Sequence, residues 1–570
     1  MRLSVNGFGG IDQRLEFDKK VGLASDMMNF RVTDSGSLVK RNGVAWLWNA
    51  PEKVDCIWSG NIGNQEMVIV ASGGQLFRIW PNRAPAQGML LGNIGAGKCL
   101  MFEFNGLLYI MTETTYHKYD GDMLRHVNGY IPLVALSCNP DGKGVVFEQL
   151  NLITDRRRQQ FSSDGTSTTY LLAEREISGV FSIKINGENA NGYSVDNEKG
   201  QVKFNAPPPL GTNNIEIIYT KNNDESFKQR ILGCTKMMIF GGNSDGRLFL
   251  WGNKNFPNYR FHSDLANGIP SAEYFPVNAF TMIGNSKINC IVQQYDKQLI
   301  FTDNQAFYSY CELREDSLGN TYSSFPVFSL NNGKGCIIET NGCIIDNRPI
   351  TLCNDGLNMW ESTSVVNEKN AVCISGPIQK AIREIIGRDI TNIRLFDFQA
   401  YREMFFICDD VAYIYNYGNG TWYRYGDFQV DCFSVYGRLL YFSRNDVMYL
   451  FGNDYQQDLE NVAFWEGIYL DGGQDFGRFD LVKFEVDLYI KGNENLRLEF
   501  QKSGFLTLST RELHFDEGDG KLLRISMRPH LKRAMPFKII FTDNGPGECI
   551  LHGFSLKTRN KERSLRDGIL

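Results

Sequence analysis

The sequence contains few of the residues from which metal and redox centres are built. Its 570 residues include 13 scattered cysteines with no C-x-x-C pair, and only six histidines with no H-x-H or H-x-x-x-H arrangement. We therefore expect reduced, mostly buried thiols, no metal and no cofactor. We expect isolated positions on the surface or in turns for the six histidines, His117, His126, His262, His514, His530 and His552.

Long runs of one residue class are also missing. The formal net charge is −6, and no basic stretch marks a dedicated DNA-binding surface. No window approaches the ~20 uninterrupted apolar residues that cross a bilayer. The first residues, MRLSVNGFGGIDQRL, lack the apolar core of a secretory signal. These absences predict no membrane-spanning segment and folding in a cytoplasm.

Motifs of the common catalytic sites are absent as well. The sequence has no G-x-S-x-G nucleophile elbow and no Walker loop. An acidic stretch beside aromatics is formed by Glu466, Asp471, Asp475 and Asp480. It is open to two interpretations, a glycosidase carboxylate pair or solvated acids in turns, and the lack of any matched spacing favours the second. We predict that the chain is not an enzyme and has no catalytic residues.

What the sequence has in quantity is aromatic residues and glycine. Phe, Trp and Tyr make up 13% of the chain, and 56 glycines supply turns, which together favour β structure. One pattern recurs: an apolar strand, a polar break, a second strand, another break and a strand with an aromatic end. Its seven copies lie at 56–80, 99–119, 237–251, 290–310, 343–360, 394–417 and 432–451.

Short antiparallel sheets of this kind cannot each bury a face alone, but stacked radially each covers the next. The repeat therefore favours a β-propeller over the alternative, a pair of β-sandwiches. Aromatic side chains that end or follow the strands are interpreted as core between sheets, with sugar-binding platforms as the alternative. These aromatics are Trp58, Trp80, Trp251, Trp360, Trp422 and Tyr425.

Other stretches break the repeat. Residues 167–221 alternate like a small inserted β-sandwich, in which GQVKF and IEIIY are expected to pair. An amphipathic helix is predicted over 377–388, and longer alternating strands after Asn453 predict a C-terminal β-sandwich that ends in a charged tail. The predicted all-β organisation is an N-terminal arm and β-hairpin (1–50), propeller blades (51–160), an inserted β-sandwich (161–224), further blades (225–455) and a C-terminal β-sandwich domain (456–570).

The N-terminal segment has the most distinctive sequence of the chain. It reads GFGGIDQRLEFDKKVGLASDMMNFRVTDSGSLVKRNGVAWL, and we expect a flexible NGFGG arm, then a hairpin over 28–40 that leads into the first blade. This segment resembles the opening of a family of phage tail and tail-stabilisation proteins that includes podovirus tail nozzle proteins. The matching positions are Gly9, Gly10, Ala24, Asn29, Gly36, Leu38, Lys40, Arg41 and Gly43. Patchier likeness continues at 247–265, at 185–196 and at 475–477.

The resemblance implies a structural protein of the virion, made in the bacterial cytoplasm, that forms an axial ring in the tail. The ring is expected to be a homo-oligomer, a hexamer, below the portal or adaptor protein. It would extend or close the DNA channel, let DNA pass without sequence-specific binding, and seat tail fibre or spike proteins. The arm would clasp a neighbouring subunit. The alternative is a carbohydrate-binding or polysaccharide-degrading tail spike, which needs a cleft with aromatics and paired carboxylates.

Overall fold

The computed structural model describes residues 2–14, 22–81, 87–223, 225–242, 245–315, 321–361, 370–388, 390–452, 462–470, 479–502, 506–529, 531–532 and 536–560. Within these ranges the chain is almost entirely β, which confirms the expected class. Its helical elements are α1 (Glu225–Leu232), α2 (Gln379–Ile386) and the short 3-10 turns η2 (Gly376–Ile378) and η3 (Gln399–Tyr401).

Each of the seven sequence repeats lies in its own four-stranded antiparallel arrangement, and we number these ring sheets 1 to 7 in the order of their first strands. Ring sheet 1 contains β6 (Val54–Ile62), β7 (Gln65–Ser72), β8 (Gln75–Ile79) and β9 (Gly88–Asn93). Ring sheet 2 contains β10 (Cys99–Phe104), β11 (Leu107–Thr112), β12 (Tyr116–Tyr119) and β13 (Leu124–His126). Ring sheet 3 contains β23 (Lys236–Gly242), β24 (Asp245–Trp251), β25 (Tyr259–His262) and β28 (Phe280–Met282).

The remaining ring sheets follow the same order. Ring sheet 4 contains β29 (Cys290–Gln294), β30 (Lys297–Phe301), β31 (Ala306–Tyr310) and β34 (Val327–Asn331). Ring sheet 5 contains β35 (Cys343–Ile345), β36 (Arg348–Cys353), β37 (Gly356–Trp360) and β38 (Ala371–Cys373). Ring sheet 6 contains β39 (Arg394–Phe398), β40 (Glu403–Cys408), β41 (Val411–Asn416) and β42 (Thr421–Tyr425). Two small hairpins, β26 (Leu265–Ala266) with β27 (Ile269–Pro270) and β32 (Glu312–Glu315) with β33 (Thr321–Ser324), project from sheets 3 and 4.

Ring sheet 7 draws its strands from both ends of the chain. It contains β43 (Phe433–Tyr436), β44 (Leu439–Arg444), β45 (Val447–Gly452) and β5 (Val44–Asn49). Strand β5 pairs antiparallel with β45, so Phe451 lies opposite Val44. The expectation that residues 40–43 lead into the first blade is therefore wrong, because β5 completes the last sheet and the chain enters ring sheet 1 only afterwards.

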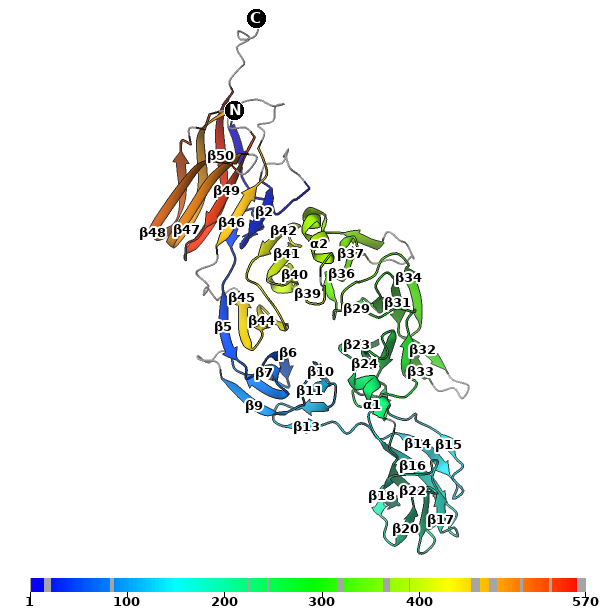
Figure 1. Cartoon of the computed structure of the whole chain (residues 1–570). Helices are drawn as coiled ribbons and strands as arrows, with labels where there is room; N and C mark the ends of the chain where they lie inside the picture. Colours follow the sequence, from blue (N-terminus) through cyan, green and yellow to red (C-terminus); the bar gives the residue numbers. More distant parts are fainter. Residues whose placement is uncertain are drawn as a thin grey trace, which may run out of the picture.

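The ring sheets follow one another around a circle in Figure 1, and apolar side chains join each to the next. Ile69 of sheet 1 and Ile110 of sheet 2 belong to one cluster, and Val70 of sheet 1 shares another with Tyr441 of sheet 7. First strands of neighbouring sheets contact one another, as β6 does with both β10 and β43. Because every sheet lends both faces to a neighbour, the apolar runs predicted as strands are buried on both sides.

Two further sheets stand between ring sheets 2 and 3. The six-stranded one contains β14 (Leu133–Cys138), β15 (Val145–Val146), β16 (Arg156–Ser163), β18 (Gly179–Ile185), β19 (Glu188–Asn189) and β22 (Gly211–Thr220). The three-stranded one contains β17 (Thr169–Leu171), β20 (Tyr193–Asp196) and β21 (Gln201–Phe204). GQVKF and IEIIY therefore do not pair, since β21 and β22 lie in different sheets. Their side chains meet in one core instead, where Phe204 clusters with Ile217.

These inserted sheets begin earlier than the sequence suggested, because β14 pairs in parallel with β16. Between their strands the chain returns to the ring, where Leu152 and Ile153 cluster with Phe275. The buried Asn151 amide fixes this return: its Nδ2 donates to the carbonyls of Tyr130 and Glu273, each at 2.8 Å. The insert is thus attached through two excursions of the chain rather than one.

The N-terminal strands join the C-terminal strands in a single large sheet that continues into ring sheet 6. Its N-terminal members are β1 (Arg2–Val5), β2 (Ala24–Met28), β3 (Phe30–Val32) and β4 (Leu38–Lys40). Its C-terminal members are β46 (Ala463–Gly467), β47 (Phe479–Lys502), β48 (Leu506–Met527), β49 (Phe537–Asp543) and β50 (Glu548–Asn560). Figure 1 shows the blue N-terminal strands lying among the orange and red ones.

The expected flexible arm is wrong for the same reason. Phe8 is buried, and its ring packs edge-on against Trp465 at 5.1 Å between centroids. Strand β1 pairs with β50, so that Val5 lies opposite Phe554. The contacts of Phe8 and Val5 hold this glycine-rich segment against other strands of the same chain. The segment therefore does not extend as an arm toward a neighbouring subunit.

Of the two helices, only α2 was predicted from the sequence. It buries Ala381, Ile382 and Ile385, as its apolar spacing indicates. Helix α1 was missed because its sequence, ESFKQRIL, is only eight residues long and mostly polar. Two apolar residues at its end do not show a helical spacing. Those residues, Ile231 and Leu232, pack with ring sheets 2 and 3 and cover the point where the insert leaves the ring.

Candidate functional site

The N-terminal segment forms a junction between the ring and the C-terminal strands. Asn29 lies at its centre, with a positive φ of 59° that separates β2 from β3. Its Nδ2 donates to the carbonyl of Val462 at 2.8 Å, while its Oδ1 accepts from the amide of Gly426 at 3.0 Å. Asn tolerates this backbone conformation better than most residues, so one buried side chain joins β46 to ring sheet 6.

Arg41 completes this polar centre. Its Nε donates to Asn29 Oδ1 at 2.9 Å, and its guanidinium lies 5.7 Å from the ring centroid of Tyr425 and 5.8 Å from that of Phe428. A buried guanidinium is costly unless its donors are used, and here carbonyls and aromatic faces surround it. Because its fork fits this cage, a Lys at position 41 would not replace it.

Lys40 turns the other way, toward a buried acid pair. Its Nζ donates to the carbonyl of Gly545 at 2.6 Å and lies 3.8 Å from Asp543 Oδ1. Glu494 faces Asp543, and burial together with this neighbour raises the pKa of Glu494 to about 8. Both acids are almost fully buried. A proton retained on Glu494 lets the two carboxyl groups share a hydrogen bond instead of repelling.

Gly10 shows how closely the N-terminal segment approaches the ring. A Cβ built on Gly10 would lie 2.4 Å from the carbonyl oxygen of Trp422, so no other residue fits there without moving backbone. Next to it, the amide of Ile11 donates to that same carbonyl at 2.7 Å. Gly10, Asn29, Lys40 and Arg41 therefore hold the ring and the C-terminal strands together.

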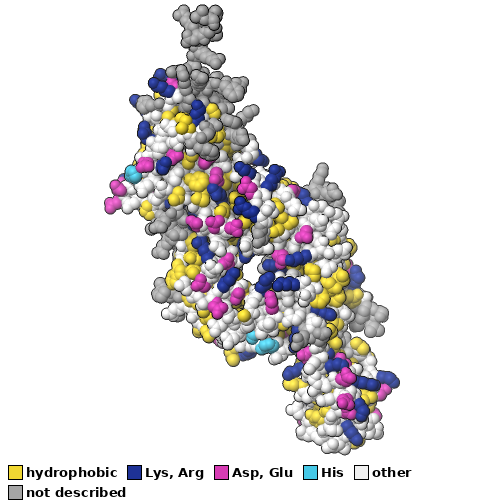
Figure 2. Space-filling model, in the orientation of Figure 1, with side chains coloured by type: hydrophobic (Ala, Val, Ile, Leu, Met, Phe, Trp, Pro, Cys, Tyr) yellow, Lys and Arg dark blue, Asp and Glu magenta, His cyan; other side chains and the backbone are white. Residues whose placement is uncertain are grey.

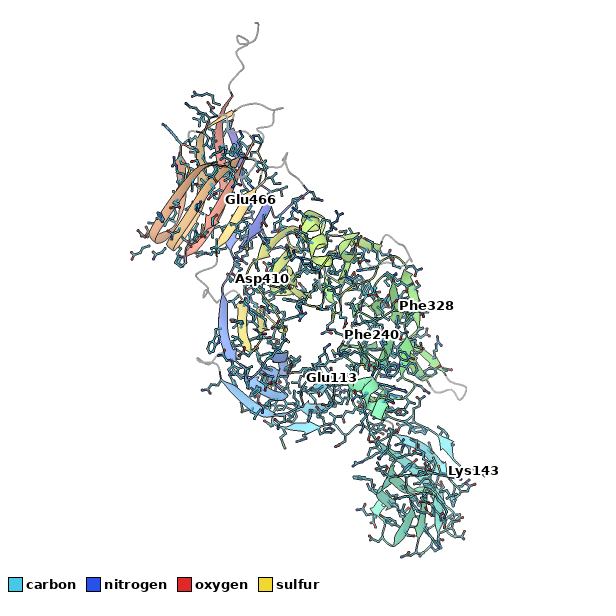
Figure 3. All side chains as sticks on the ribbon, in the orientation of Figure 1. Glu113, Lys143, Phe240, Phe328, Asp410 and Glu466 are labelled. Atoms are coloured by element: carbon cyan, nitrogen blue, oxygen red, sulfur yellow. The ribbon has the colours of Figure 1, made fainter. Side chains whose placement is uncertain are left out.

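The acidic stretch is not brought together as a catalytic pair by the described residues. Glu466, labelled in Figure 3 on the C-terminal part of the sheet, accepts a hydrogen bond from Ser25 Oγ at 2.9 Å and forms an ion pair with Lys538. This carboxylate neutralises a buried ammonium and has a structural role. Asp480 lies in β47, whereas Asp471 and Asp475 fall outside the described residues, as does the 475–477 match.

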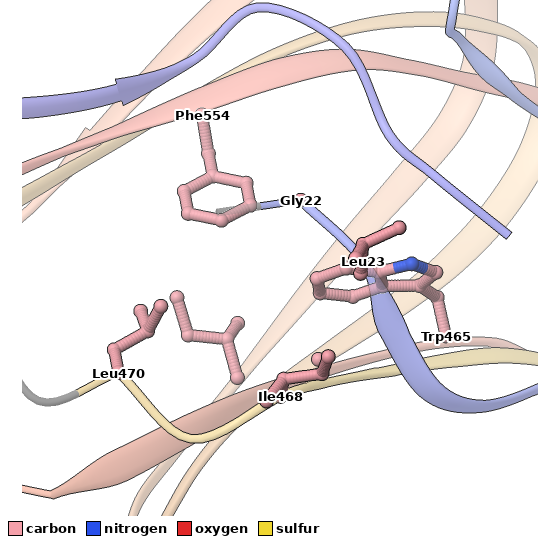
Figure 4. A pocket seen from close by; sticks show the side chains of 8 residues that line it. Gly22, Leu23, Trp465, Ile468, Leu470 and Phe554 are labelled. Atoms are coloured by element: carbon pink, nitrogen blue, oxygen red, sulfur yellow. The ribbon is translucent and has the colours of Figure 1, made fainter. Parts of the chain in front are cut away.

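A small apolar cavity lies beside the junction (Figure 4). Gly22, Leu23, Trp465, Ile468, Leu470 and Phe554 are among the residues that line it. Its volume of about 10 Å³ is barely that of one water, and its walls offer almost no polar partner. It is a packing defect rather than a ligand site.

The strand-end aromatics are mainly core, as the sequence analysis favoured. Trp251, Trp360, Trp422 and Tyr425 are fully buried, which removes them as exposed sugar platforms. Trp360 Nε1 donates to Thr351 Oγ1 at 2.8 Å, so its polar edge is satisfied inside ring sheet 5. Trp58 and Trp80 are half-buried.

His126 and His514 are exposed, as expected, whereas His262 departs from the expected surface position. His262 is enclosed by Phe249 and Phe325 in β25, and burial lowers its pKa to about 4. His117 and His126 lie opposite each other across β12 and β13. His530 falls outside the described residues, and the described ones contain no group of three or more metal-ligating side chains. All 13 cysteines are free thiols, most of them buried, as expected.

Sequence reasoning missed one further feature, the outer edge of β48. This 22-residue strand pairs along β47 and, among the described strands, with no other. Figure 1 shows it at the rim of the C-terminal sheet. Its first residues, LTLST, carry no charge, and Leu506 is 61% exposed. Such an edge presents unpaired N–H and C=O groups to any strand that approaches.

Comparisons with known proteins give no family. No family model matches the sequence, and no curated protein is similar to it. PorZ of the type-IX secretion system of Porphyromonas gingivalis is 10% identical, with a TM-score of 0.34 over 77% of this chain and 44% of that chain, so the chain spans under half of its length. An exo-β-1,3-galactanase from Phanerochaete chrysosporium is 9% identical over 82% and 97% of the chains, with a TM-score of 0.16. A family 43 arabinoxylan arabinofuranohydrolase from Bacillus subtilis is 9% identical over 90% and 97%, with a TM-score of 0.21. Scores this low carry no argument about fold or function.

Proposed function

We propose that the seven ring sheets are the blades of a β-propeller, and that the chain is a structural component of a bacteriophage tail of the nozzle or hub type. The pairing of β5 with β45 supports the propeller, because it ties the N-terminal strand into the last blade. The inserted and C-terminal sheets would then be β-sandwich domains carried by it. The resemblance of the N-terminal segment is what points to a tail.

One observation carries the assembly role: the long open edge of β48. A soluble monomer usually shortens, charges or covers such an edge. From Arg511 to Arg524 β48 carries charged side chains, but its first five residues, LTLST, carry none, so it is this part of the edge that is left unprotected. A strand from a neighbouring copy would cover it by β-augmentation. We propose that copies of the chain pair along this edge and assemble into a hexameric ring on the tail axis.

In this proposal the chain performs no bond chemistry. The ring would lie below the portal or adaptor, extend or close the DNA channel, and seat fibres or spikes on its outer surface. A mildly acidic channel wall would keep DNA from adhering, since DNA binds surfaces whose Lys and Arg side chains neutralise its phosphates and release their counterions. No helix among the described residues is long and apolar enough to cross a membrane.

Electron cryo-microscopy of whole particles that contain this chain tests the proposal. The expected result is an axial ring in which β48 pairs with a strand of the adjacent copy. The substitutions Thr507→Lys and Ser509→Lys should then prevent ring assembly, whereas Leu522→Lys, at an exposed position of the same strand, should not. A single copy away from the tail axis, or absence from the particle, would overturn the proposal.

A glycan-binding role is the second candidate, and exposed aromatics on ring sheet 4 favour it. The rings of Tyr310 and Phe328 are stacked, with centroids 5.7 Å apart and planes 6° apart. Phe328, labelled in Figure 3, is 40% exposed. Aromatic faces of this kind bind sugar rings. A glycan array on the purified chain, with Phe328→Ala as the comparison, separates this role from a purely structural one.

A further inference from the structure

A polar cavity opens on the C-terminal sheet, where β1, β50, β47 and β48 pair side by side. Ser4, Asn6, Glu485, Asp487, Arg524 and His552 are among the residues that line it. Its volume is about 280 Å³, close to the lower end of the range for small-molecule sites, about 300–1,000 Å³. Unlike the apolar cavity beside the junction, this polar cavity has room for a ligand and polar groups that can hold it.

The register of the strands gathers these polar side chains on one face of the sheet. Ser555 of β50 lies opposite Glu485 of β47. Asp487, two residues further along β47, lies opposite Arg524 of β48. Val486, between the two acids, is buried in the core. Because side chains alternate between the two faces of a strand, the polar cavity lies on the outer face of the sheet.

A β-bulge adds a histidine to the same face. Asp487 pairs with Gly553, and the next residue of β47 pairs with Leu551, so His552 is the extra residue of β50. Bulges of this kind turn a side chain in a new direction and are frequent beside functional sites. His552 lines the polar cavity, and its ring is held in place because its Nδ1 lies 3.0 Å from Ser37 Oγ.

The charges of the lining are balanced within the chain. Arg524 Nε and Nη2 donate to the two oxygens of Asp487 at 2.6 and 2.8 Å. Lys483, outside the lining, donates to Glu485 at 2.6 Å, and Arg2 Nη2 lies 3.5 Å from the same carboxylate. The bonds from Arg524 and Lys483 hold the pKa of both acids below their ordinary values, so both are ionised acceptors at neutral pH. Figure 2 shows basic and acidic side chains interspersed over the C-terminal strands on the face in view.

These groups keep hydrogen-bonding capacity for a ligand. A carboxylate accepts about four hydrogen bonds and a guanidinium donates about five, and the pair of Asp487 and Arg524 uses only two of each. The side chains of Ser4 and Asn6 form no hydrogen bond within the described part of the chain. Donors and acceptors therefore lie close together in the polar cavity, with little net charge.

This combination favours a neutral polyhydroxy ligand. A hydroxyl group both donates and accepts, so neighbouring hydroxyls of a sugar ring can bridge a carboxylate and a guanidinium. A strongly charged ligand such as phosphate would meet a carboxylate beside each guanidinium of the lining, which opposes its binding. An apolar ligand would leave the polar walls without partners.

We propose that the polar cavity binds a neutral hexose, either free or as a unit of a glycan, through its hydroxyl groups. Asp487 and Glu485 accept hydrogen bonds from the sugar, and Arg524 and Asn6 donate to it. The site is distinct from the aromatic pair on ring sheet 4. It belongs to the single chain and does not depend on the tail role proposed above.

Saturation-transfer NMR of the full chain tests this site with the methyl α-glycosides of glucose, galactose and mannose, and with lactose as a glycan fragment. We expect transfer to at least one of these neutral sugars. Arg524→Gln and Asp487→Asn should each weaken its binding about tenfold or more, since each removes a hydrogen bond to a charged group. Arg511→Gln, at another exposed arginine of β48, is the matched control and should bind like the parent. Stronger binding of lactose would indicate a glycan unit, and equal binding a free sugar.

Ser4→Tyr provides a second test that leaves the charged pairs intact. Ser4 is exposed, so the larger side chain should not disturb the fold, but it should fill the polar cavity and abolish transfer. Phe328→Ala should leave transfer unchanged. Absence of transfer from every neutral sugar at millimolar concentrations would refute the site, as would binding of glucuronate or glucosamine alone. Loss of transfer in Phe328→Ala but not in Ser4→Tyr would place sugar binding on ring sheet 4 and also refute it.

Discussion

The rings of Phe484 and Phe500 lie 5.4 Å apart between centroids, at an angle of 87°, although both belong to strand β47. Sixteen residues of straight strand would separate them by roughly 50 Å. The strand is therefore folded back, and the pairing shifts register between Gly492 and Glu494. Gly492 has a φ of +84°, which suits a sharp bend there. Strand β50 pairs with the first half of β47 and β49 with the second, so one folded sheet encloses the C-terminal core.

Removing either ring should weaken this fold. We expect Phe484→Ala and Phe500→Ala each to lower the free energy of unfolding by about 3–5 kcal/mol, because both rings are fully buried. The double variant should lose about 0.5–1.5 kcal/mol less than the sum, which is the share of the edge-to-face contact. Urea unfolding measures these values, with the exposed Leu522→Ala as a control that should change little. Strict additivity of the two losses would contradict the contact.

Asn29 should prove the most sensitive residue of the junction. Asn29→Ala loses every side-chain bond, and Ala tolerates the positive φ less well than Asn, so we expect a loss of more than about 2 kcal/mol. Asn29→Gly relieves the backbone and should lose less. Asn29→Asp keeps the acceptor for Arg41 and Gly426 and sacrifices only the donor to Val462. Thermal unfolding should rank the variants Asp and Gly above Ala. An equal loss in all three would contradict both reasons for this ranking, the retained acceptor in Asp and the relieved backbone in Gly.

Much of the ring was readable from the sequence because its signals are local. Apolar runs separated by short polar turns, among them Asn105-Gly106 and Asp355-Gly356, mark the three inner strands of most sheets, although the copy at 237–251 contains only β23 and β24. The fourth strands were not seen, since strands such as β9 and β13 are mostly exposed and carry no alternating pattern. Strands β5 and β45 pair although all the other ring sheets lie between them in the sequence, and no local spacing predicts that pairing.

The junction could be noticed from the sequence but not understood. Lys40 and Arg41 stand side by side in the resemblance motif, yet one faces Asp543 and the other faces Asn29 and Tyr425. Their partners lie hundreds of residues away or in a neighbouring turn. The open edge of β48 was missed for a different reason: a strand's pattern tells which face is buried, not which edge is paired.

The buried pair of Glu494 and Asp543 should make stability depend on pH. The pKa of Glu494 is raised from its ordinary 4.5 to about 8, so between these values the folded chain holds a proton that the unfolded chain has lost. The free energy of unfolding therefore falls as pH rises through this window and levels off above about 8. Lys40, which favours the charged form, and the buried thiol of Cys549 are the other titratable groups that face the pair.

Glu494→Gln keeps the shape of the side chain and removes its titration. We expect the variant to show a flatter stability profile between pH 5 and 8 and to be the more stable protein near pH 8, as measured by urea midpoints. Glu512→Gln, at an exposed position of β48, should leave the parent profile unchanged. A variant Glu494→Gln with the same slope as the parent would place the titration elsewhere.

The insert provides a test of how the chain is threaded. Residues 167–221 are the segment that the sequence isolates, and their removal with a short Gly-Ser join looks harmless from the pattern alone. In the structure that cut removes β22, the partner of both β16 and β18, and leaves the buried side of β16 without a cover. We expect this variant to aggregate.

A second design removes the insert but keeps the return segment that Asn151 fixes to the ring. Leu133 and Glu148 lie together, since the amide of Glu148 donates to the carbonyl of Leu133 at 2.9 Å, so a short turn can replace 134–147. Arg156 and Thr220 are paired partners, so a second turn can replace 157–219. Closing loops between ends already in contact costs little conformational entropy. Residues 148–156 then remain to pack against Phe275, and Asn151 among them still donates to the carbonyls of Tyr130 and Glu273. We expect a monodisperse, folded ring by size-exclusion chromatography and circular dichroism. If the double excision aggregates while the single excision of 167–221 folds, the ring needs the strands β14 to β16 that only the single excision keeps, and the return segment alone does not anchor it.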